Sequence, residues 1–227
     1  AFQYQNRISV EFNHLYHWHP LMPESFHVGD REYSIPEYVF NMDVSTQQGM
    51  KNMVDSLVQQ QAGKVTNNNH PKMTLHVAKE TIIHGRTLRF QSLNQYRQRF
   101  RLQPYTSFEE LTGEKETAAY LAEAYGGEID AVEFYVGLMV ERHRPEAMFG
   151  ATVIEVGGPF SVKGLMSNPI CSPRYWKPST FGGEVGFNLV KTASLKKLFC
   201  FNMEGDCSNV GFHVPGMETV PGMETDN

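Results

Sequence analysis

Apolar residues recur at helical spacing from the start of the chain. Ile8, Phe12 and Leu15 follow the i, i+4, i+7 spacing of one helix face. Pro20 is a stop signal, because proline lacks the amide hydrogen that a continuing helix needs. The pattern therefore predicts a first helix that ends near His19.

Three further segments show a similar pattern. Apolar residues line one face over 47–61, and Gly63 is placed to end that helix. Amphipathic segments follow at 73–90 and 94–102, although the first of these also fits a strand. We expect at least two helices from this part of the chain.

Helix ends are marked most clearly in the middle of the chain. The motif SFEE at 107–110 is a capping box, and it opens a short helix that Gly113 closes. The alanine-rich segment KETAAYLAEAYGG at 115–127 is a helix ended by paired glycines. Since the pattern singles out no strand, the predicted fold class is mainly α.

The sequence divides into a long region that is expected to fold around a core and a short tail with few residues to bury. Apolar content rises after Asp130, and the two halves of 1–207 are expected to share one core. The remaining segment, 208–227, repeats the hexapeptide VPGMET and offers little to bury, so we expect a disordered tail.

Composition and charge exclude two classes of function. The chain has 227 residues, of which 41% are hydrophobic, and its formal charge is −5. Lys and Arg are scattered, so no basic stripe is present for nucleic acid to bind. The longest apolar run, FYVGLMV at 134–140, is far shorter than the roughly 20 residues of a membrane-spanning helix.

The segment FNHLYHWHP at 12–20 carries the candidate chemistry. His14, His17 and His19 make up a third of the nine histidines in the chain. One interpretation is a zinc site that uses His14 and His17. A second is a single axial haem ligand, His19, with Tyr16 one helical turn away and close to the porphyrin. The third is a packed helix end with no ligand, and the residues alone leave all three open.

A second candidate site lies in ATVIEVGGPFSVKGLM at 151–166. Five residues fall on one helical face, and two of them are adjacent glycines, each costing about 1 kcal/mol relative to alanine in a helix: Ile154, Gly157, Gly158, Ser161 and Leu165. Pro159 is expected to kink this helix. The missing side chains either leave a groove for a slender apolar ligand or permit close helix packing. Ser161 has no nucleophile-elbow motif and no adjacent base.

Long motifs link these segments to a known family. EFNHLYHWHPLMPESF, PYTSFEELTGEKE, RPEAMFGATVIEVGGPFSVKGLM and ICSPRYWKPSTFGGEVGFNLVKTASLKKL resemble the C-terminal part of the catalytic domain of the prostaglandin endoperoxide synthases, or cyclooxygenases. The resemblance runs from about Gln5 to Cys207. It implies a mainly α, haem-peroxidase-like domain of the animal peroxidase type, of which 1–207 would be the C-terminal part.

The resemblance assigns roles to single residues. His19 would be the axial ligand of the iron of haem b, and Tyr16 the catalytic tyrosine that becomes a radical. Ser161 would be the channel serine that aspirin acetylates in this family. Ile154 and Arg144 stand where the two vertebrate isoforms differ. The full set of implied channel residues is Phe12, Trp18, Arg144, Phe149, Ile154, Gly157, Gly158, Ser161 and Val162.

The resemblance also implies an activity and its setting. The family is bifunctional, a dioxygenase and peroxidase that converts arachidonate and O2 to prostaglandin G2 and then H2. It works as a homodimer held peripherally on the lumenal face of the endoplasmic reticulum and on the nuclear envelope. The membrane anchor, the distal peroxidase residues and the carboxylate-binding arginine are expected before Ala1, so this chain alone should be inactive.

Some residues depart from the family pattern. Gly158 and Val162 replace a usual alanine and leucine, which implies a wider channel. Cys200 and Cys207 are the disulfide candidates, with six residues between them where the family has five. Two alternatives remain: a related haem dioxygenase that makes only a fatty-acid hydroperoxide, and a non-enzymatic helical interaction domain.

Overall fold

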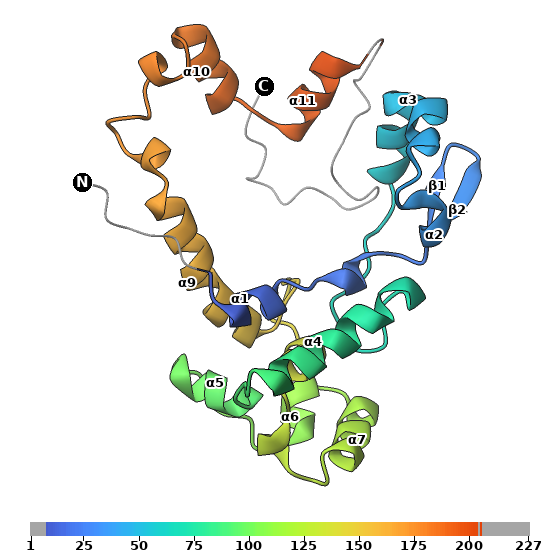
Figure 1. The fold of residues 1–227 in the computed structure, drawn as a ribbon, viewed down its shortest axis with the longest axis vertical. Helices are drawn as coiled ribbons and strands as arrows, with labels where there is room; N and C mark the ends of the chain where they lie inside the picture. Colours follow the sequence, from blue (N-terminus) through green and yellow to red (C-terminus); the bar gives the residue numbers. More distant parts are fainter. Residues whose placement is uncertain (1–7, 204, 206–227) are drawn as a thin grey trace. The chain divides into compact units, whose positions relative to one another are not determined.

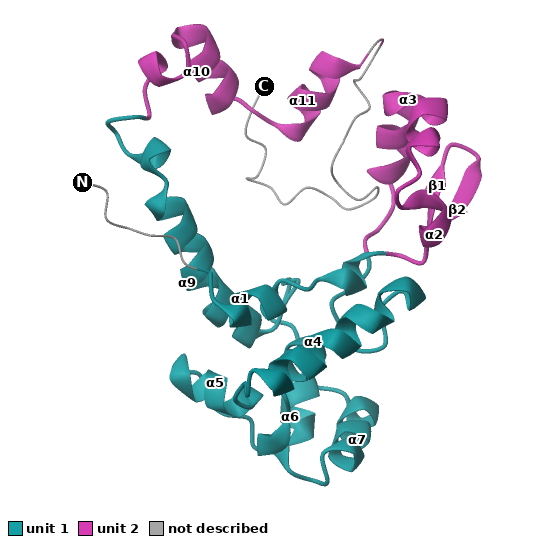
Figure 2. Ribbon diagram, viewed as in Figure 1, with its two compact units in different colours: residues 1–22, 63–175 teal, residues 23–62, 176–227 magenta. Residues whose placement is uncertain are grey.

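The computed structural model describes residues 8–203 and 205 and divides the chain into two units (Figure 2). Unit 1 contains 1–22 and 63–175, and unit 2 contains 23–62 and 176–227. The predicted tail at 208–227 and Cys207 lie outside the described residues, so the tail and the Cys200 bridge stay predictions. Cys171 is an exposed free thiol.

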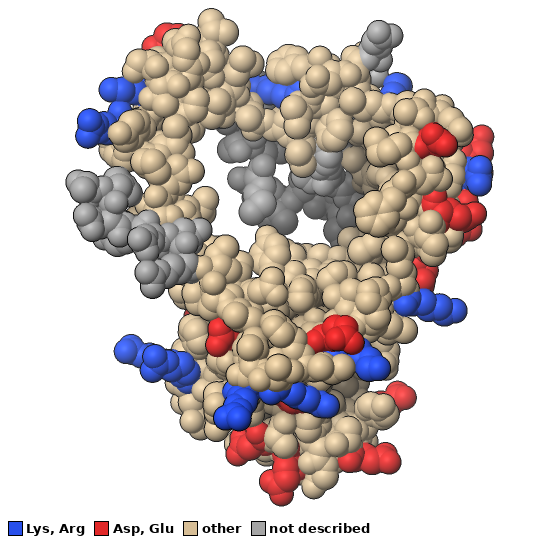
Figure 3. Space-filling view, in the orientation of Figure 1, with Lys and Arg blue, Asp and Glu red and all other residues tan. Residues whose placement is uncertain are grey.

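Unit 1 is built of α- and 3-10 helices (Figure 1). Its elements are α1 (Val10–Leu15), η1 (His19–Leu21), η2 (Lys72–Thr74), α4 (Leu75–Thr87), α5 (Leu93–Arg99), α6 (Phe108–Thr112), α7 (Lys115–Ala124), η3 (Ile129–Ala131), α8 (Phe134–Val140), α9 (Ala151–Ser167) and η4 (Pro169–Cys171). On the face shown in Figure 3, charges of both signs are interspersed over this unit.

The core of unit 1 forms around α8. Six of its seven residues are buried, because its sequence FYVGLMV has no polar face. Helices α1, α4, α5 and α6 all contact it. The largest fully buried apolar side chains of the unit include Leu15, Leu93, Leu111, Phe134 and Leu138.

Unit 2 contains strands that the sequence pattern did not reveal. Strands β1 (Ser25–Val28) and β2 (Arg31–Ser34) pair antiparallel, with Phe26 opposite Tyr33. Each strand has four residues, too few for its alternation to stand out. The other elements are α2 (Ile35–Tyr38), α3 (Met42–Leu57), η5 (Pro178–Thr180), α10 (Glu184–Lys191) and α11 (Leu195–Asn202).

The helix predicted over 47–61 is placed too late in the chain. Helix α3 starts at Met42, where the side chain of Asn41 accepts a hydrogen bond from the amide of Asp43 at 3.2 Å. The chain kinks at Gly49, whose φ of 72° is non-helical. The prediction missed the first five residues of α3, at 42–46, where apolar residues are sparse.

The other helix predictions in this region are confirmed by α4, α5, α6 and α7. Ser107 caps α6 by accepting from the amide of Glu110 at 3.1 Å, and Gly113 ends it with a φ of 71°. The capping box is only half present, because the Glu110 carboxylate accepts from the amide of Thr106 instead. Among the described residues, no helix is long and apolar enough to span a bilayer.

Candidate functional site

The helix that carries the aromatic and histidine cluster is shorter than the sequence pattern predicts. Helix α1 ends at Leu15, and the indole of Trp18 donates a hydrogen bond of 2.8 Å to the Leu15 carbonyl. His19 then opens the separate helix η1, with Pro20 at its second position. Tyr16 and His19 are therefore not one turn apart on a single helix, and that prediction is wrong. The indole of Trp18 bonds to the Leu15 carbonyl in place of the backbone amide that a continuing helix would supply, so α1 can end at Leu15.

Aromatic rings surround Tyr16. Its ring stacks on Phe12 at 5.4 Å between centroids and lies 4.2 Å from Trp18. Trp18 in turn contacts Phe149 at 4.8 Å, and Phe12 contacts Phe160 of α9 at 5.6 Å. The structure thus places two of the predicted channel residues against Tyr16 and a third, Phe149, against Trp18, while more than half of the Tyr16 side chain remains exposed.

His17 is fixed by a residue distant in sequence. Its Nδ1 lies 2.9 Å from Oγ1 of Thr81, which also lies 2.7 Å from the Val77 carbonyl. A hydroxyl has one hydrogen, and a carbonyl can only accept, so Thr81 donates to Val77 and accepts from His17. The proton of His17 is therefore on Nδ1, and burial lowers its pKa.

His14 does not pair with His17 in a metal site. The two rings stack at 6.1 Å, as their spacing predicted, but Nε2 of His14 lies 2.9 Å from Nδ1 of His84. Within residues 8–203 and 205, no group of three His, Cys, Asp or Glu side chains is arranged to hold a metal ion. Since zinc sites use three or four protein ligands, the geometry does not support the zinc interpretation.

The second predicted constellation lies on α9, which is helical on both sides of Pro159. A Cβ added to Gly157 would lie 3.0 Å from Cδ2 of Leu15, so this glycine permits α1 and α9 to pack closely. A Cβ added to Gly158 would meet no described atom within 4 Å beyond its own helix backbone and chain neighbours. Close helix packing therefore accounts for Gly157, and the groove expected at Gly158 stays a prediction.

The remaining channel candidates differ in exposure. Ile154 is half-buried, whereas Ser161 and Val162 are exposed on the second half of α9. Arg144 lies in the loop before α9 and forms an ion pair of 2.8 Å with Glu155 of that helix. These residues share α9 or its approach, so one helix positions most of the predicted channel wall.

A buried ionic network fixes the start of α9. The carboxylate of Glu141 accepts from the guanidinium of Arg97, the hydroxyl of Tyr105, and the hydroxyl and amide of Thr152, at 2.7 to 2.9 Å. Sequence reasoning missed these residues, because Arg97 and Glu141 are 44 positions apart and sit in segments that otherwise look amphipathic.

Sequence reasoning also missed the contact between His70 and Tyr135. Nε2 of His70 lies 3.1 Å from the hydroxyl of Tyr135, and burial raises the pKa of Tyr135 to about 12. The ring of Tyr135 meets that of His17 edge-on at 6.3 Å. Neither His70 nor Tyr135 lies in a recognisable sequence motif, and only the fold brings them to the histidine cluster.

Comparison with known protein families and curated proteins assigns this chain to a family. The chain belongs to the animal haem peroxidase family, whose model matches residues 3–206. It is 57% identical over 215 residues to prostaglandin G/H synthase 1 of Rattus norvegicus, covering 94% of this chain and 35% of that protein. It is 55% identical over 214 residues to prostaglandin G/H synthase 2 of Gallus gallus, again covering 94% and 35%. The resemblance seen in the sequence is confirmed, and the chain spans about a third of these relatives' length.

Solved structures with low sequence identity share the fold. A fatty acid alpha-dioxygenase from Arabidopsis thaliana matches with a TM-score of 0.80 and 19% identity, covering 94% of this chain and 40% of that one. The enzyme from Oryza sativa matches with a TM-score of 0.77 and 19% identity, covering 85% and 36%. These matches confirm the mainly α, peroxidase-like fold.

The residues present fit the haem that the family implies. Burial, with a nearby His76, lowers the pKa of His19, so its ring is neutral at pH 7 as an iron ligand requires. Its Nδ1 is buried and has no hydrogen-bond partner in the part of the chain that the structure describes. A single neutral histidine without a cluster of other ligands suits axial haem ligation better than a site made wholly of side chains.

Proposed function

We propose that this chain is part of a haem b-dependent fatty-acid dioxygenase and peroxidase that converts arachidonate to prostaglandin G2 and then H2. The observation that carries the proposal is the position of Tyr16. Its ring lies in an aromatic cluster that touches α9, three residues before the neutral His19. The identity to prostaglandin G/H synthases over 94% of this chain supports the assignment.

His19 and Tyr16 take the two central roles. His19 holds the iron of haem b, which when bound supplies the oxidising power of the reaction. Tyr16 gives up one electron and its phenolic proton, and the resulting tyrosyl radical takes a hydrogen atom from a bis-allylic carbon of the fatty acid. Two O2 molecules then add to the substrate.

The channel residues position the fatty acid beside Tyr16. Phe12 and Trp18 pack against the tyrosine and Phe149 packs against Trp18, while the open space over Gly158 leaves room for an acyl chain along α9. Ile154, Gly157, Ser161 and Val162 line the same helix, and Arg144 stands near its start.

The cellular setting implied by the sequence resemblance is proposed together with the activity. We propose a homodimer held peripherally on the lumenal side of the endoplasmic reticulum and on the nuclear envelope. We also keep the prediction that nucleic acid is no partner and that Cys200 bridges to Cys207.

The test compares the complete wild-type protein with Tyr16→Phe, both loaded with haem. Oxygen uptake on arachidonate should be lost in the variant, while peroxidase activity on a hydroperoxide is retained. Phenylalanine keeps the ring but has no hydroxyl hydrogen to lose. Equal oxygen uptake in the two proteins would remove Tyr16 from the mechanism.

A related dioxygenase that makes only a hydroperoxide is the second candidate. The shared fold with fatty acid alpha-dioxygenases keeps it in view, although that likeness concerns the fold alone. Product analysis separates the two, because only a cyclooxygenase closes the endoperoxide ring. A non-enzymatic interaction domain would show neither product.

A further inference from the structure

Two side chains of α4 bind the chain on either side of Tyr16. Nδ1 of His84 lies 2.9 Å from Nε2 of His14, and Oγ1 of Thr81 lies 2.9 Å from Nδ1 of His17. His14 comes two positions before the tyrosine and His17 one position after it. Because residues three apart on a helix lie on one face, a single face of α4 makes both bonds.

Burial strengthens this attachment. His14 is 0% exposed and Thr81 is 4% exposed. A hydrogen bond that is shielded from water is stronger than an exposed one, and breaking it leaves a buried polar atom unpaired. Thr81 donates its own hydrogen to the Val77 carbonyl at 2.7 Å, so its oxygen stays directed at His17 as an acceptor. His14 and His17 therefore have little freedom to move away from α4.

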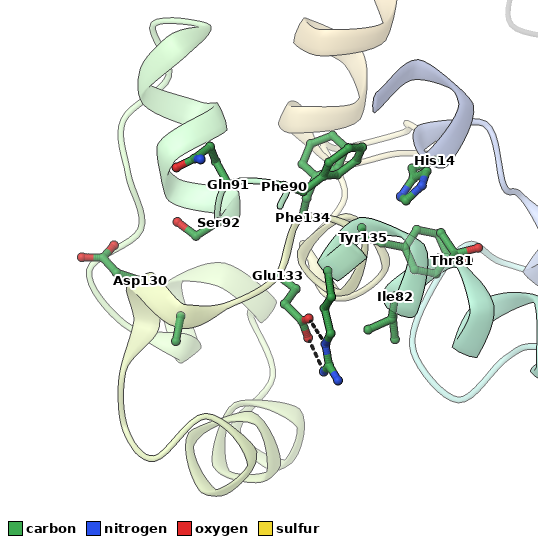
Figure 4. A pocket seen from close by; sticks show the side chains of 13 residues that line it. His14, Thr81, Ile82, Phe90, Gln91, Ser92, Asp130, Glu133, Phe134 and Tyr135 are labelled. Carbon is green, nitrogen blue, oxygen red and sulfur yellow. Dashed lines mark hydrogen bonds and ion pairs between the residues drawn. The ribbon is translucent and has the colours of Figure 1, made fainter. Parts of the chain in front are cut away.

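Apolar packing on this side of His14 is incomplete. A cavity of about 260 Å³ lies beside it, lined among others by Thr81, Gly85 and Phe90 (Figure 4). The imidazole contacts the Phe90 ring at 4.6 Å between centroids, but the empty space of the cavity supplies no contacts. The position of His14 thus depends on its hydrogen bond to His84 as well as on packing.

Tyr16 projects away from α4. Successive residues of a helix turn by about 100°, so Tyr16 at the end of α1 points almost opposite to His14. Its ring stacks on Phe12, and Phe12 contacts Phe160 of α9 at 5.6 Å. Helix α1 ends at Leu15, so no further helical turn fixes the tyrosine. How far the phenol reaches toward α9 is therefore set by the histidines on either side of it.

The short helix η1, which begins at His19, has attachments of its own. The side-chain amide of Asn69 donates to the Pro20 carbonyl at 3.2 Å, and the backbone amide of Gly63 donates to the Leu21 carbonyl at 2.9 Å. Neither bond involves α4. A change in the two α4 side chains should therefore move the tyrosine more than the proposed haem ligand.

We propose that Thr81 and His84 are positioning residues for the radical step: acting through His17 and His14, they set the place and the ring angle of Tyr16. The inference rests on the proposed function, in which Tyr16 carries the radical. A displacement of about 1 Å at a reacting group can lower a rate roughly 100-fold, so a side chain that never touches the substrate can still control the reaction.

The experiment uses the complete protein loaded with haem and records the EPR spectrum of the tyrosyl radical formed with a hydroperoxide. The splitting by the β-methylene protons depends on the rotation of the ring about its Cβ–Cγ bond, so it reports how Tyr16 is held. Thr81→Val keeps the shape of the side chain without its hydroxyl, and His84→Phe keeps a ring against His14 without its nitrogens. Both should change the splitting and lower oxygen uptake on arachidonate about tenfold, with peroxidase activity retained. Thr81→Ser restores the hydroxyl and should restore the splitting and the uptake.

Thr87→Val is the matched control on the same helix. The Thr87 hydroxyl donates to the Ile83 carbonyl at 2.9 Å, as Thr81 does to Val77, but it is exposed and bonds no histidine in the described part of the chain. This variant should match wild type in every measurement.

The outcomes separate this inference from the proposed function. A wild-type spectrum and uptake in Thr81→Val and His84→Phe would overturn the positioning role, and so would equal losses of uptake and peroxidase activity. A wild-type protein without the radical, or a radical that persists in Tyr16→Phe, would instead overturn the proposed function and this inference with it.

Discussion

The carboxylate of Glu141 lies 2.7 Å from Nη1 of Arg97, and solvent reaches almost nothing of either side chain, with 0% and 7% exposed. The guanidinium also stands 3.8 Å over the ring of Tyr105. Glu141 follows α8, Arg97 is in α5, and Thr152 at the start of α9 bonds to both. The pair therefore ties α5 and the end of α8 to the start of α9, the helix that carries most of the proposed channel wall.

Removing the charge of Glu141 should strongly destabilise the protein. Glu141→Gln keeps the shape of the side chain but leaves Arg97 as an uncompensated buried cation. Breaking one side of such a pair costs about 3–5 kcal/mol. Urea unfolding of wild type and variant should show a loss of that size in the free energy of unfolding.

An exposed ion pair between α9 and the loop before it supplies the control. Glu155 pairs with Arg144 at 2.8 Å, close to the 2.7 Å of the buried pair, but the side chains are 44% and 43% exposed. Exposed pairs contribute about 0–1 kcal/mol, so Glu155→Gln should change stability by no more than that. Similar losses in the two variants would show that burial does not set the strength of the Glu141 pair.

The adjacent glycines of α9 should respond differently to substitution. Gly158→Ala adds a methyl group in open space, so the higher helix propensity of alanine should raise the free energy of unfolding by about 1 kcal/mol. Gly157→Val pushes against Leu15, which is 2% exposed and cannot move aside, and should lower it by about 1–3 kcal/mol.

Thermal and urea unfolding of the two variants measure this difference. If Gly157→Val were tolerated as well as Gly158→Ala, α1 would not pack closely on α9. Gly158→Ala also bears on the proposed channel, because its methyl group would narrow the space predicted for the acyl chain. Slower oxygen uptake on arachidonate with unchanged peroxidase activity is the expected result.

Local signals in the sequence predicted local structure well. Ser107 and Gly113 marked the ends of α6 because caps depend only on neighbouring backbone groups. The end of α1 was placed wrongly, because the bond from Trp18 to Leu15 satisfies the helix end before Pro20 does. Strands of four residues in unit 2 carried too short a pattern to detect.

The residues of the candidate site also fall into two groups: those that a local motif marks, and those that only the fold brings together. Tyr16 and His19 could be singled out because they lie in one continuous motif shared with a family. Thr81 and Tyr135, which reach His17 from 64 and 118 positions away in the sequence, could not. Their roles depend on α4 and α8 packing beside the cluster, which no local pattern encodes.

Stability should fall in weak acid because of His14. Burial, and then the imidazoles of His84 and His17, lower its pKa from 6.5 to about 4, while Glu11 opposes the shift. Between these values the unfolded chain binds a proton that the folded chain does not, so unfolding becomes more favourable as the pH falls. The contribution lost between pH 7 and pH 5 is about 2 kcal/mol.

Urea unfolding at pH 7 and pH 5 tests this with His14→Asn as the comparison. Asparagine does not titrate, so the variant should lose about 2 kcal/mol less than wild type over the same interval. His17, His19 and His70 also have lowered pKa values, but they are present in both proteins and cancel in the difference. Equal pH dependence in the two proteins would place the pKa of His14 near its ordinary value.

Haem binding should depend on His19 and not on histidines in general. His19→Gln removes the neutral imidazole proposed as the axial ligand, while glutamine has a similar length and polarity. The loss of haem affinity should exceed the roughly 10–100-fold that removal of an outer-shell partner costs. His27→Gln makes the same chemical change on an exposed position of β1 and should leave haem binding unchanged. Titration of the haem-free complete protein, followed by the Soret band, measures both. An unaltered Soret spectrum and affinity in His19→Gln would mean that another residue holds the iron.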